Sequence, residues 1–411
     1  MGHDHAHTLE RSAAQWFAPT ARATRALARV LIERIEAGAL TLELPSGERL
    51  SRHAATPGPD AVMKLHRWSA LRRVVTRGDI GFAEGYMEGD WSTPDLTSLL
   101  AFLHANEACL AVAWKGTLLQ RLVDRLVHGR RANTRSGSRR NIAAHYDLGN
   151  DFYAAWLDPS MSYSSGLFGH DGDSLETAQM AKINRVAELL ELRQGDRILE
   201  IGCGWGGLAE HLAREHGARM TCLTLSREQL AVAARRLAGA DASGASRALL
   251  LDYRDCRGQF DRVVSIEMME ATGESYWPQY FATIRDRLAP GGTAVLQVIT
   301  IAEDRFEGYR ERPDFIQRYI FPGGMLPTVT HMRALSAEAG LTLDTVELFG
   351  ASYARTVAQW RERFLRAWPM MTGELRSEGF RNMWEYYLAY CEIGFSTGAI
   401  DVGLYRLRKA S

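Results

Sequence analysis

The alternation of apolar and polar residues changes character along the chain. Up to about residue 127 the pattern is mostly helical, with one β-hairpin expected where residues 39–44 alternate and lead into the turn signal Pro45-Ser46-Gly47. Within residues 110–127 the apolar side chains recur at helical spacing, namely Leu110, Trp114, Leu118, Leu122, Val123 and Val127. We therefore expect a mostly helical N-terminal domain.

A second pattern begins near residue 197, where short apolar runs alternate with helical runs. The expected strands are Arg197–Ile201, Arg219–Leu225, Ala248–Leu251, Phe260–Ile266 and Thr293–Ile301. The expected helices are Leu208–His216, Arg227–Leu237 and Tyr276–Leu288. This alternation predicts an α/β fold with a doubly wound parallel sheet. Residues 303–400 are aromatic-rich and mostly helical, and a last strand is expected at residues 402–407.

Composition and charge narrow the possible functions. The chain has 411 residues, with 49 basic and 49 acidic side chains, so its formal net charge is zero. A neutral chain is not expected to bind nucleic acid over its whole surface. The five cysteines (Cys109, Cys203, Cys222, Cys256 and Cys391) lack any metal-binding spacing, and we interpret them as reduced thiols of a cytosolic enzyme without a metal. No stretch approaches the roughly 18 to 20 apolar residues of a membrane span.

One segment departs from this neutrality. Residues 115–140 contain eight basic residues and one acid, a net charge of +7. The part at residues 129–140 is polar and contains Gly and Ser, which indicates an interdomain linker after an N-terminal domain at residues 1–128. Two interpretations stay open: a solvated linker, or a patch that binds anionic lipid, where each basic residue contributes about 1 kcal/mol.

A glycine-rich loop follows the first expected strand. Gly202, Gly204 and Gly207 form a GxGxxG pattern between a strand and a helix. Such a loop lets the backbone approach a ligand and offers unpaired N–H groups at the helix N-terminus. The pattern suits a dinucleotide or S-adenosylmethionine equally. The acid that a dinucleotide site carries about 20 residues on is absent from residues 224–226, although Arg227 could hold an NADP phosphate.

These alternatives are separated by a resemblance that runs in order from about residue 78 to the C-terminus. The segments that carry it are GYMEGDW (85–91), HYDLGND (145–151), YSS (163–165), IGCGWGG (201–207), LTLS (223–226) with Gln229, DYR (252–254), YIFP (319–322) and FLRAWP (364–369). In these segments the chain resembles the cyclopropane fatty acid synthase family, to which the mycolic acid methyltransferases are closely related. The resemblance implies a class I methyltransferase domain at residues 141–411, with an insertion at residues 302–400 that covers the acyl chain.

The resemblance also implies S-adenosyl-L-methionine as the cofactor and assigns residues to it. The implied positions are Tyr163 and Ser164 over the methionine end, Gly202 and Gly204 beneath the cofactor, Thr224 and Gln229 at the ribose, and Tyr253 with Asp252 at the adenine. The 1–128 domain is expected to associate with lipid or membrane.

The chemistry of the family is methyl transfer to a carbon–carbon double bond in a dry, well-oriented site. A carbocation forms, and a bound bicarbonate removes a proton from it. The bicarbonate is held by a Cys, a Glu, a His, a Tyr and an Ile main-chain group. The matching positions here are Ser165, Glu270, Gln297, Tyr353 and Ile299, so two of the five differ. In addition, Glu267 stands where the family has a glycine.

Glu267 and Glu270 lie three residues apart, just after an expected strand. A helical turn would direct both carboxylates into one cavity. Two carboxylates in a dry site cannot both ionise cheaply, so one would hold a raised pKa and act as a general base without bicarbonate. A structural role for Glu267, as a loop cap or the partner of an arginine, is the alternative. The product stays open between a cyclopropane ring, a methylene or methyl branch and a methylated diene.

We therefore expect an S-adenosylmethionine-dependent C-methyltransferase that acts on unsaturated acyl chains of membrane phospholipids. The alternatives are an NADP-dependent oxidoreductase and a lipid-binding protein with a vestigial nucleotide pocket. The expected partners are phospholipid and an anionic membrane surface, with no nucleic acid. The expected location is the cytoplasm, peripherally at the inner membrane surface, and bacterial relatives suggest a homodimer.

Overall fold

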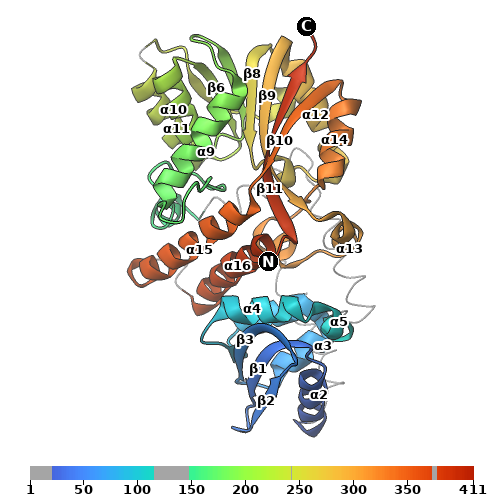
Figure 1. Cartoon of the computed structure of the whole chain (residues 1–411). Helices are drawn as coiled ribbons and strands as arrows, with labels where there is room; N and C mark the ends of the chain where they lie inside the picture. Colours follow the sequence, from blue (N-terminus) through green and yellow to red (C-terminus); the bar gives the residue numbers. More distant parts are fainter. Residues whose placement is uncertain (1–20, 115–147, 242, 373–376) are drawn as a thin grey trace, which may run out of the picture. The chain divides into compact units, whose positions relative to one another are not determined.

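The computed structural model describes residues 21–114, 148–241, 243–372 and 377–411 (Figure 1). The chain divides into two compact units. The first contains the described residues up to Trp114 together with Ser377–Tyr386, and the second contains the other described residues. The expected linker at residues 129–140, and the expected helix beyond Trp114, lie outside the described residues.

The first unit combines helices with a four-stranded sheet of order β2-β1-β3-β4. Its strands are β1 (Ala37–Glu43), β2 (Arg49–His53), β3 (Thr56–Leu65) and β4 (Trp91–Ser92). Its helices are α2 (Ala21–Glu33), α3 (Ser69–Met87), α4 (Leu96–Ala105) and α5 (Glu107–Trp114). The antiparallel pair β1 and β2 confirms the expected hairpin, whereas β3 was not expected.

Trp91 organises the packing of this unit. The buried indole stacks on Phe82 with ring centroids 4.3 Å apart, and its N–H donates to the Phe82 carbonyl at 2.9 Å. A Cβ atom at Gly85 would lie 2.9 Å from the Trp91 ring, so glycine at this position allows the close approach. The GYMEGDW segment is therefore a packing motif within the first unit.

The second unit is built on a seven-stranded sheet of order β10-β11-β9-β8-β5-β6-β7. The strands are β5 (Arg197–Ile201), β6 (Arg219–Thr224), β7 (Arg247–Leu250), β8 (Phe260–Ile266), β9 (Leu288–Ile301), β10 (Leu341–Leu348) and β11 (Ile400–Lys409). Strands β5 to β9 pair in parallel, whereas β11 is antiparallel to both of its neighbours. The expected doubly wound α/β sheet is confirmed, with one strand reversed.

Helices cover both faces of this sheet. The helices of the second unit are α8 (Asn150–Ala154), α9 (Leu175–Leu190), α10 (Gly207–His216), α11 (Arg227–Ala240), α12 (Trp277–Arg287), α13 (Phe306–Glu311), α14 (Val329–Glu338) and α15 (Gly350–Ala367). Helix α16 (Glu378–Ser396) has residues in both units. Figure 1 shows α9, α10 and α11 on one face of the sheet and α12 and α14 on the other.

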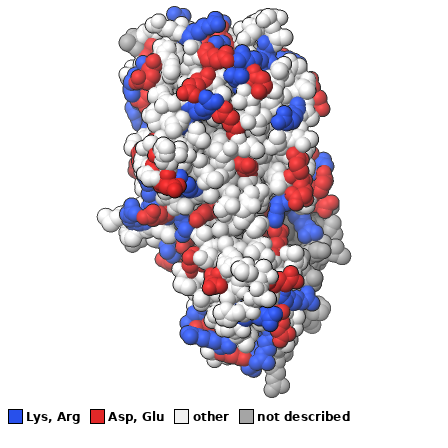
Figure 2. Space-filling model, viewed as in Figure 1, with Lys and Arg blue, Asp and Glu red and all other residues white. Residues whose placement is uncertain are grey.

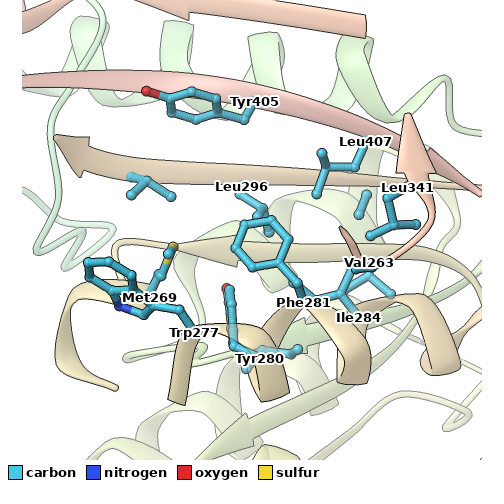
Figure 3. Close-up of a cluster of buried hydrophobic side chains, with 14 of the residues drawn as sticks. Val263, Met269, Trp277, Tyr280, Phe281, Ile284, Leu296, Leu341, Tyr405 and Leu407 are labelled. Atoms are coloured by element: carbon cyan, nitrogen blue, oxygen red, sulfur yellow. The ribbon is translucent and has the colours of Figure 1, made fainter. Parts of the chain in front are cut away.

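Successive residues of the central strands enter different cores because strand side chains alternate between faces. Ile198 and Val264 join the core formed with α9, α10 and α11, whereas Leu199 and Val263 join the core formed with α12. Figure 3 shows the second core, in which Phe281 and Ile284 of α12 pack beneath the strands. These two cores fix the strand ends that carry the candidate site.

The C-terminal third differs from the expected single helical insertion. Residues 302–400 are mostly helical, but they include β10, an edge strand of the sheet, and α14, which packs beside α12. No helix among the described residues is long and apolar enough to cross a membrane. On the face shown in Figure 2, acidic and basic side chains are interspersed rather than separated by sign.

Candidate active site

The loop between β5 and α10 forms a cradle at the N-terminus of α10. Gly202 and Gly204 have φ angles of +82° and +52°, which L side chains rarely adopt. The N–H groups of Gly202 and Cys203 both donate to the Leu223 carbonyl on β6, at 3.0 and 2.9 Å. A Cβ atom at Gly204 would meet no atom within 4 Å, so the backbone faces open space there. The loop therefore fits a nucleotide-type cofactor such as S-adenosyl-L-methionine.

The residues expected at the ribose and adenine lie at the carboxyl ends of β6 and β7, where a doubly wound sheet binds its ligand. Thr224 donates to the side-chain oxygen of Gln229 at 2.8 Å. The buried Asp252 carboxylate accepts from the backbone N–H of Arg254 at 3.0 Å and from its guanidinium at 2.8 and 2.6 Å. These contacts orient the side chains, and their roles toward the cofactor stay predictions.

The segment at residues 163–166 borders an aromatic cluster. The Tyr163 hydroxyl lies 2.9 Å from that of Tyr387, and its ring packs against Trp360 with centroids 5.3 Å apart. The neighbouring Ser164 is buried, and its hydroxyl accepts from the Lys182 ammonium at 2.7 Å. The expectation that Tyr163 and Ser164 cover the methionine end of the cofactor stays a prediction.

Three of the positions expected to hold a bicarbonate instead surround the carboxylate of Glu267. The Ser165 N–H donates to Oε1 at 2.9 Å, and the Gln297 amide donates to the same oxygen at 2.6 Å. The Tyr353 hydroxyl donates to Oε2 at 2.5 Å. The Ser165 hydroxyl points elsewhere and donates to the Gly166 carbonyl. Glu267 is therefore held by donors on both of its carboxylate oxygens.

The backbone at Glu267 is left-handed, with φ +50°. This region costs an L residue roughly 1–2 kcal/mol, and glycine occupies it without that cost. The Glu267 N–H donates to the Gln297 carbonyl at 2.8 Å, which ties the strained residue to β9. Strain of this kind persists where surrounding contacts hold the residue, and at Glu267 the backbone bond to β9 and the three side-chain donors do so.

Glu270 lies in the 3₁₀ turn Met269–Ala271, which takes the place of the expected helical turn. Its Oε1 accepts from the Ile299 N–H at 2.5 Å, whereas its Oε2 is buried without a hydrogen-bond partner in the described chain. Burial, followed by the negative charge of Glu267, raises the pKa of Glu270 to about 8. Burial also raises the pKa of Glu267, against the opposing effect of its hydrogen-bond donors. The structure thus places both carboxylates in buried surroundings with raised pKa values.

Two residues of α9 that contact this region were missed by the sequence analysis. The Gln179 amide donates to the Ser164 carbonyl at 2.7 Å, and Lys182 donates to the Ser164 hydroxyl at 2.7 Å. Both lie on the buried face of α9, between Leu175 and Val186. Polar residues at core-facing positions of an amphipathic helix are the signal that could have identified them.

The seven-stranded doubly wound sheet with one reversed strand and the glycine-rich loop after β5 are the fold and cofactor loop of a class I methyltransferase. The family model "Mycolic acid cyclopropane synthetase" matches residues 133–404. The curated relatives include tuberculostearic acid methyltransferase UfaA1 of Mycobacterium tuberculosis, which is 38% identical over 93% of this chain and 91% of its own length. Another is the cyclopropane-fatty-acyl-phospholipid synthase of Escherichia coli, 38% identical over 82% of this chain and 84% of its own length.

A solved structure of a mycolic acid cyclopropane synthase is also similar to this chain. Mycolic acid cyclopropane synthase CmaA1, complexed with SAH and CTAB, matches with a TM-score of 0.60 and 28% identity, over 66% of this chain and 98% of its own. The chain therefore belongs to the mycolic acid cyclopropane synthetase family. It is a methyltransferase whose cofactor is S-adenosyl-L-methionine. An oxidoreductase or carrier function is not favoured by these relatives.

Proposed function

We propose that the protein methylates a double bond in unsaturated acyl chains of membrane phospholipids. S-adenosyl-L-methionine supplies an activated methyl group when bound. The proposal is supported by relatives named for reactions on fatty acids and acyl phospholipids. It is also supported by the aromatic rings beside the site, among them Tyr163 and Trp360, because aromatic faces tolerate the positive charge that develops on the acyl chain.

The position of Glu267 is the observation that carries the proposed chemistry. A bicarbonate would need the donors Ser165, Gln297 and Tyr353, and these already serve the Glu267 carboxylate. A second anion beside two buried carboxylates would also be repelled. The residues present therefore do not fit a bound bicarbonate, and a protein carboxylate takes the proton in the proposed reaction.

The first experiment tests the reaction itself. Purified protein is incubated with S-adenosyl-L-methionine and vesicles of an unsaturated phospholipid, and the acyl chains are analysed by mass spectrometry. We expect chains heavier by one methylene unit, and NMR then distinguishes a ring from a branch. Folded protein that binds the cofactor but leaves every acyl chain unchanged would overturn the proposed function.

The second experiment tests the base. Turnover of bicarbonate-depleted enzyme is compared with turnover after bicarbonate is added back, and we expect equal rates. Glu270→Gln is expected to lose about 10² to 10⁴-fold in rate, the usual effect of removing a general base. Its calorimetric affinity for S-adenosylhomocysteine should stay unchanged because the amide keeps the shape of the side chain. Strong activation of the wild type by bicarbonate would show that the two-carboxylate chemistry is wrong.

We further propose that the protein works peripherally at an anionic membrane surface in the cytoplasm, through its basic segment at residues 115–140. The support is the +7 charge of that segment in a chain of zero net charge. Binding to vesicles of anionic phospholipid should weaken steeply with salt, because exposed charges are screened within about 8 Å at physiological ionic strength. Vesicle binding that ignores both salt and anionic lipid would overturn this proposal.

A further inference from the structure

Lys182 is a buried cation without an ion pair. Its side chain in α9 is only 2% exposed, and no salt bridge joins it to a carboxylate within the described residues. Its hydrogen bond there is the one to the Ser164 hydroxyl, at 2.7 Å. A buried ammonium is costly unless other charges oppose it, so its surroundings indicate what it does.

Two adjacent residues connect Lys182 to the active-site carboxylate. Lys182 binds the Ser164 side chain, and the next residue, Ser165, donates its N–H to Glu267. Gln179, one turn earlier on α9, holds the Ser164 carbonyl and so fixes the same segment. The ammonium is therefore held in a defined place relative to Glu267.

Acidic groups outnumber basic ones around Lys182, Glu267 and Glu270. Lys182 is attracted by three acids, namely Glu267, Asp158 and Glu200. Glu267 also acts on the Cys391 thiol of α16, and Glu270 acts on the phenols Tyr280, Tyr309 and Tyr405. Arg333 also acts on Tyr405, but among the described groups whose charge acts on Glu267 or Glu270, Lys182 is the one cation.

The two glutamates differ in what holds them. Glu267 receives three hydrogen bonds and the attraction of Lys182, all of which favour its charged form. Glu270 receives the Ile299 N–H, faces the like charge of Glu267, and keeps Oε2 without a partner in the described chain. A proton entering the pair is therefore directed to Glu270.

We propose that Lys182 is a positioning residue whose charge keeps Glu267 as a carboxylate, so that the proton from the acyl chain goes to Glu270. The inference rests on the proposed function. In this step a carbon–hydrogen bond next to the carbocation breaks, and its electron pair forms the new bond to the cationic carbon. The proton forms an O–H bond at Oε2 of Glu270, and Glu267 keeps its charge.

The test measures kcat against pH in Lys182→Met, which keeps the length of the side chain without its charge. Loss of the nearby cation raises the pKa of Glu267. The form of the enzyme in which both glutamates are ionised then appears at higher pH, so the acid limb should move upward by about one pH unit, equivalent to a tenfold loss of rate on that limb. Lys182→Arg should restore the wild-type limb because it keeps the charge. The matched control is Lys64→Met on β3, where Lys64 pairs with Glu43 at the surface, and its profile should be that of the wild type.

A double-variant cycle separates a charge effect from a structural one. In a Glu267→Gln background, Lys182→Met should move the acid limb by much less, because Lys182 acts through the charge of Glu267. Unfolding followed by circular dichroism gives a readout without turnover. Burial lowers the pKa of Lys182 from 10.5 to about 8, so wild-type stability should rise between those pH values, and Lys182→Met should lack that rise.

The outcomes are distinguishable. A wild type that transfers no methyl group overturns the proposed function. An active wild type combined with a folded Lys182→Met of unchanged pH profile overturns the role of Lys182 alone. Should Lys182→Met not fold, the same limb is measured in Ser164→Ala, which removes the hydrogen bond that orients the ammonium. An unshifted limb in that variant also overturns the inference.

Discussion

The backbone at residue 267 is left-handed, which suits glycine, yet the side chain there is a buried glutamate held by three donors. The sequence resemblance places Ser165, Gln297 and Tyr353 at one site, but it assigns them to a separate bicarbonate ion. That Glu267 itself reaches these donors depends on its positive φ, which no periodicity in the sequence reveals. Lys182 was missed for a related reason, because a lysine in an amphipathic helix is ordinarily exposed.

Glu267→Gly should relax the backbone and leave a space of carboxylate size between Ser165, Gln297 and Tyr353. Turnover should fall at least about 10²-fold through loss of an active-site carboxylate. Added bicarbonate or formate should restore part of it, because the three donors are then free to bind a small anion. Rates are measured with and without each anion.

Glu267→Gln is the matched control for this experiment. The amide fills the same space without a charge, so its low rate should not respond to added anions. Equal rescue of the two variants, or rescue of neither, would contradict the view that Glu267 stands in for a separate anion.

At the scale of secondary structure, the sequence identified the five parallel strands β5 to β9, the edge strand β7 included, whereas β3 and β10 were not expected. Strands β5 and β8 have the bounds expected, and their apolar residues are buried between two helical layers. Strand β10 is an edge strand with many partly exposed polar residues, which weakens its pattern. In β3, Pro57 and Pro59 lack the N–H that a ladder hydrogen bond needs, and they lie where the pairing with β1 shifts register.

The β5–α10 loop allows a prediction about cofactor binding. Gly204→Val should abolish measurable binding of S-adenosylhomocysteine in calorimetry, because φ +52° strains a β-branched residue and its side chain would enter the open space of the cradle. Gly172→Val is the control, since its Cβ atom also meets open space but its φ is not in the positive range. Normal affinity in a folded Gly204→Val protein would remove this loop from the cofactor site.

At the scale of the whole molecule, the second unit buries several ionisable groups whose pKa values depart from those of free side chains. Burial raises the pKa of Glu200 and of Glu270 from 4.5 to about 8. A carboxyl whose folded pKa is raised contributes stability that is complete below its unfolded pKa and is lost as pH rises through the folded value. These two groups should therefore lower stability between pH 4.5 and about 8.

Glu270→Gln should reduce this loss, because the amide cannot ionise. The thermal midpoint of the wild type should fall between about pH 5 and pH 8, and the variant should fall less over the same range. Differential scanning calorimetry at several pH values measures both. Glu362→Gln, a change at an exposed ion pair on α15, should keep the wild-type decline. A variant that tracks the wild type would mean that Glu270 is already ionised at low pH.

A carboxylate that belongs to the chain does not bind and leave the site as a separate bicarbonate ion would. The site around Ser165, Gln297 and Tyr353 is filled as soon as the protein folds, and the ordering cost, including the left-handed turn at Glu267, is met once rather than at every turnover. Its occupancy cannot follow the level of dissolved carbon dioxide or the competition of other small anions. On the proposed chemistry, the proton-transfer step should therefore run at the same rate in a medium stripped of carbon dioxide as in one saturated with it.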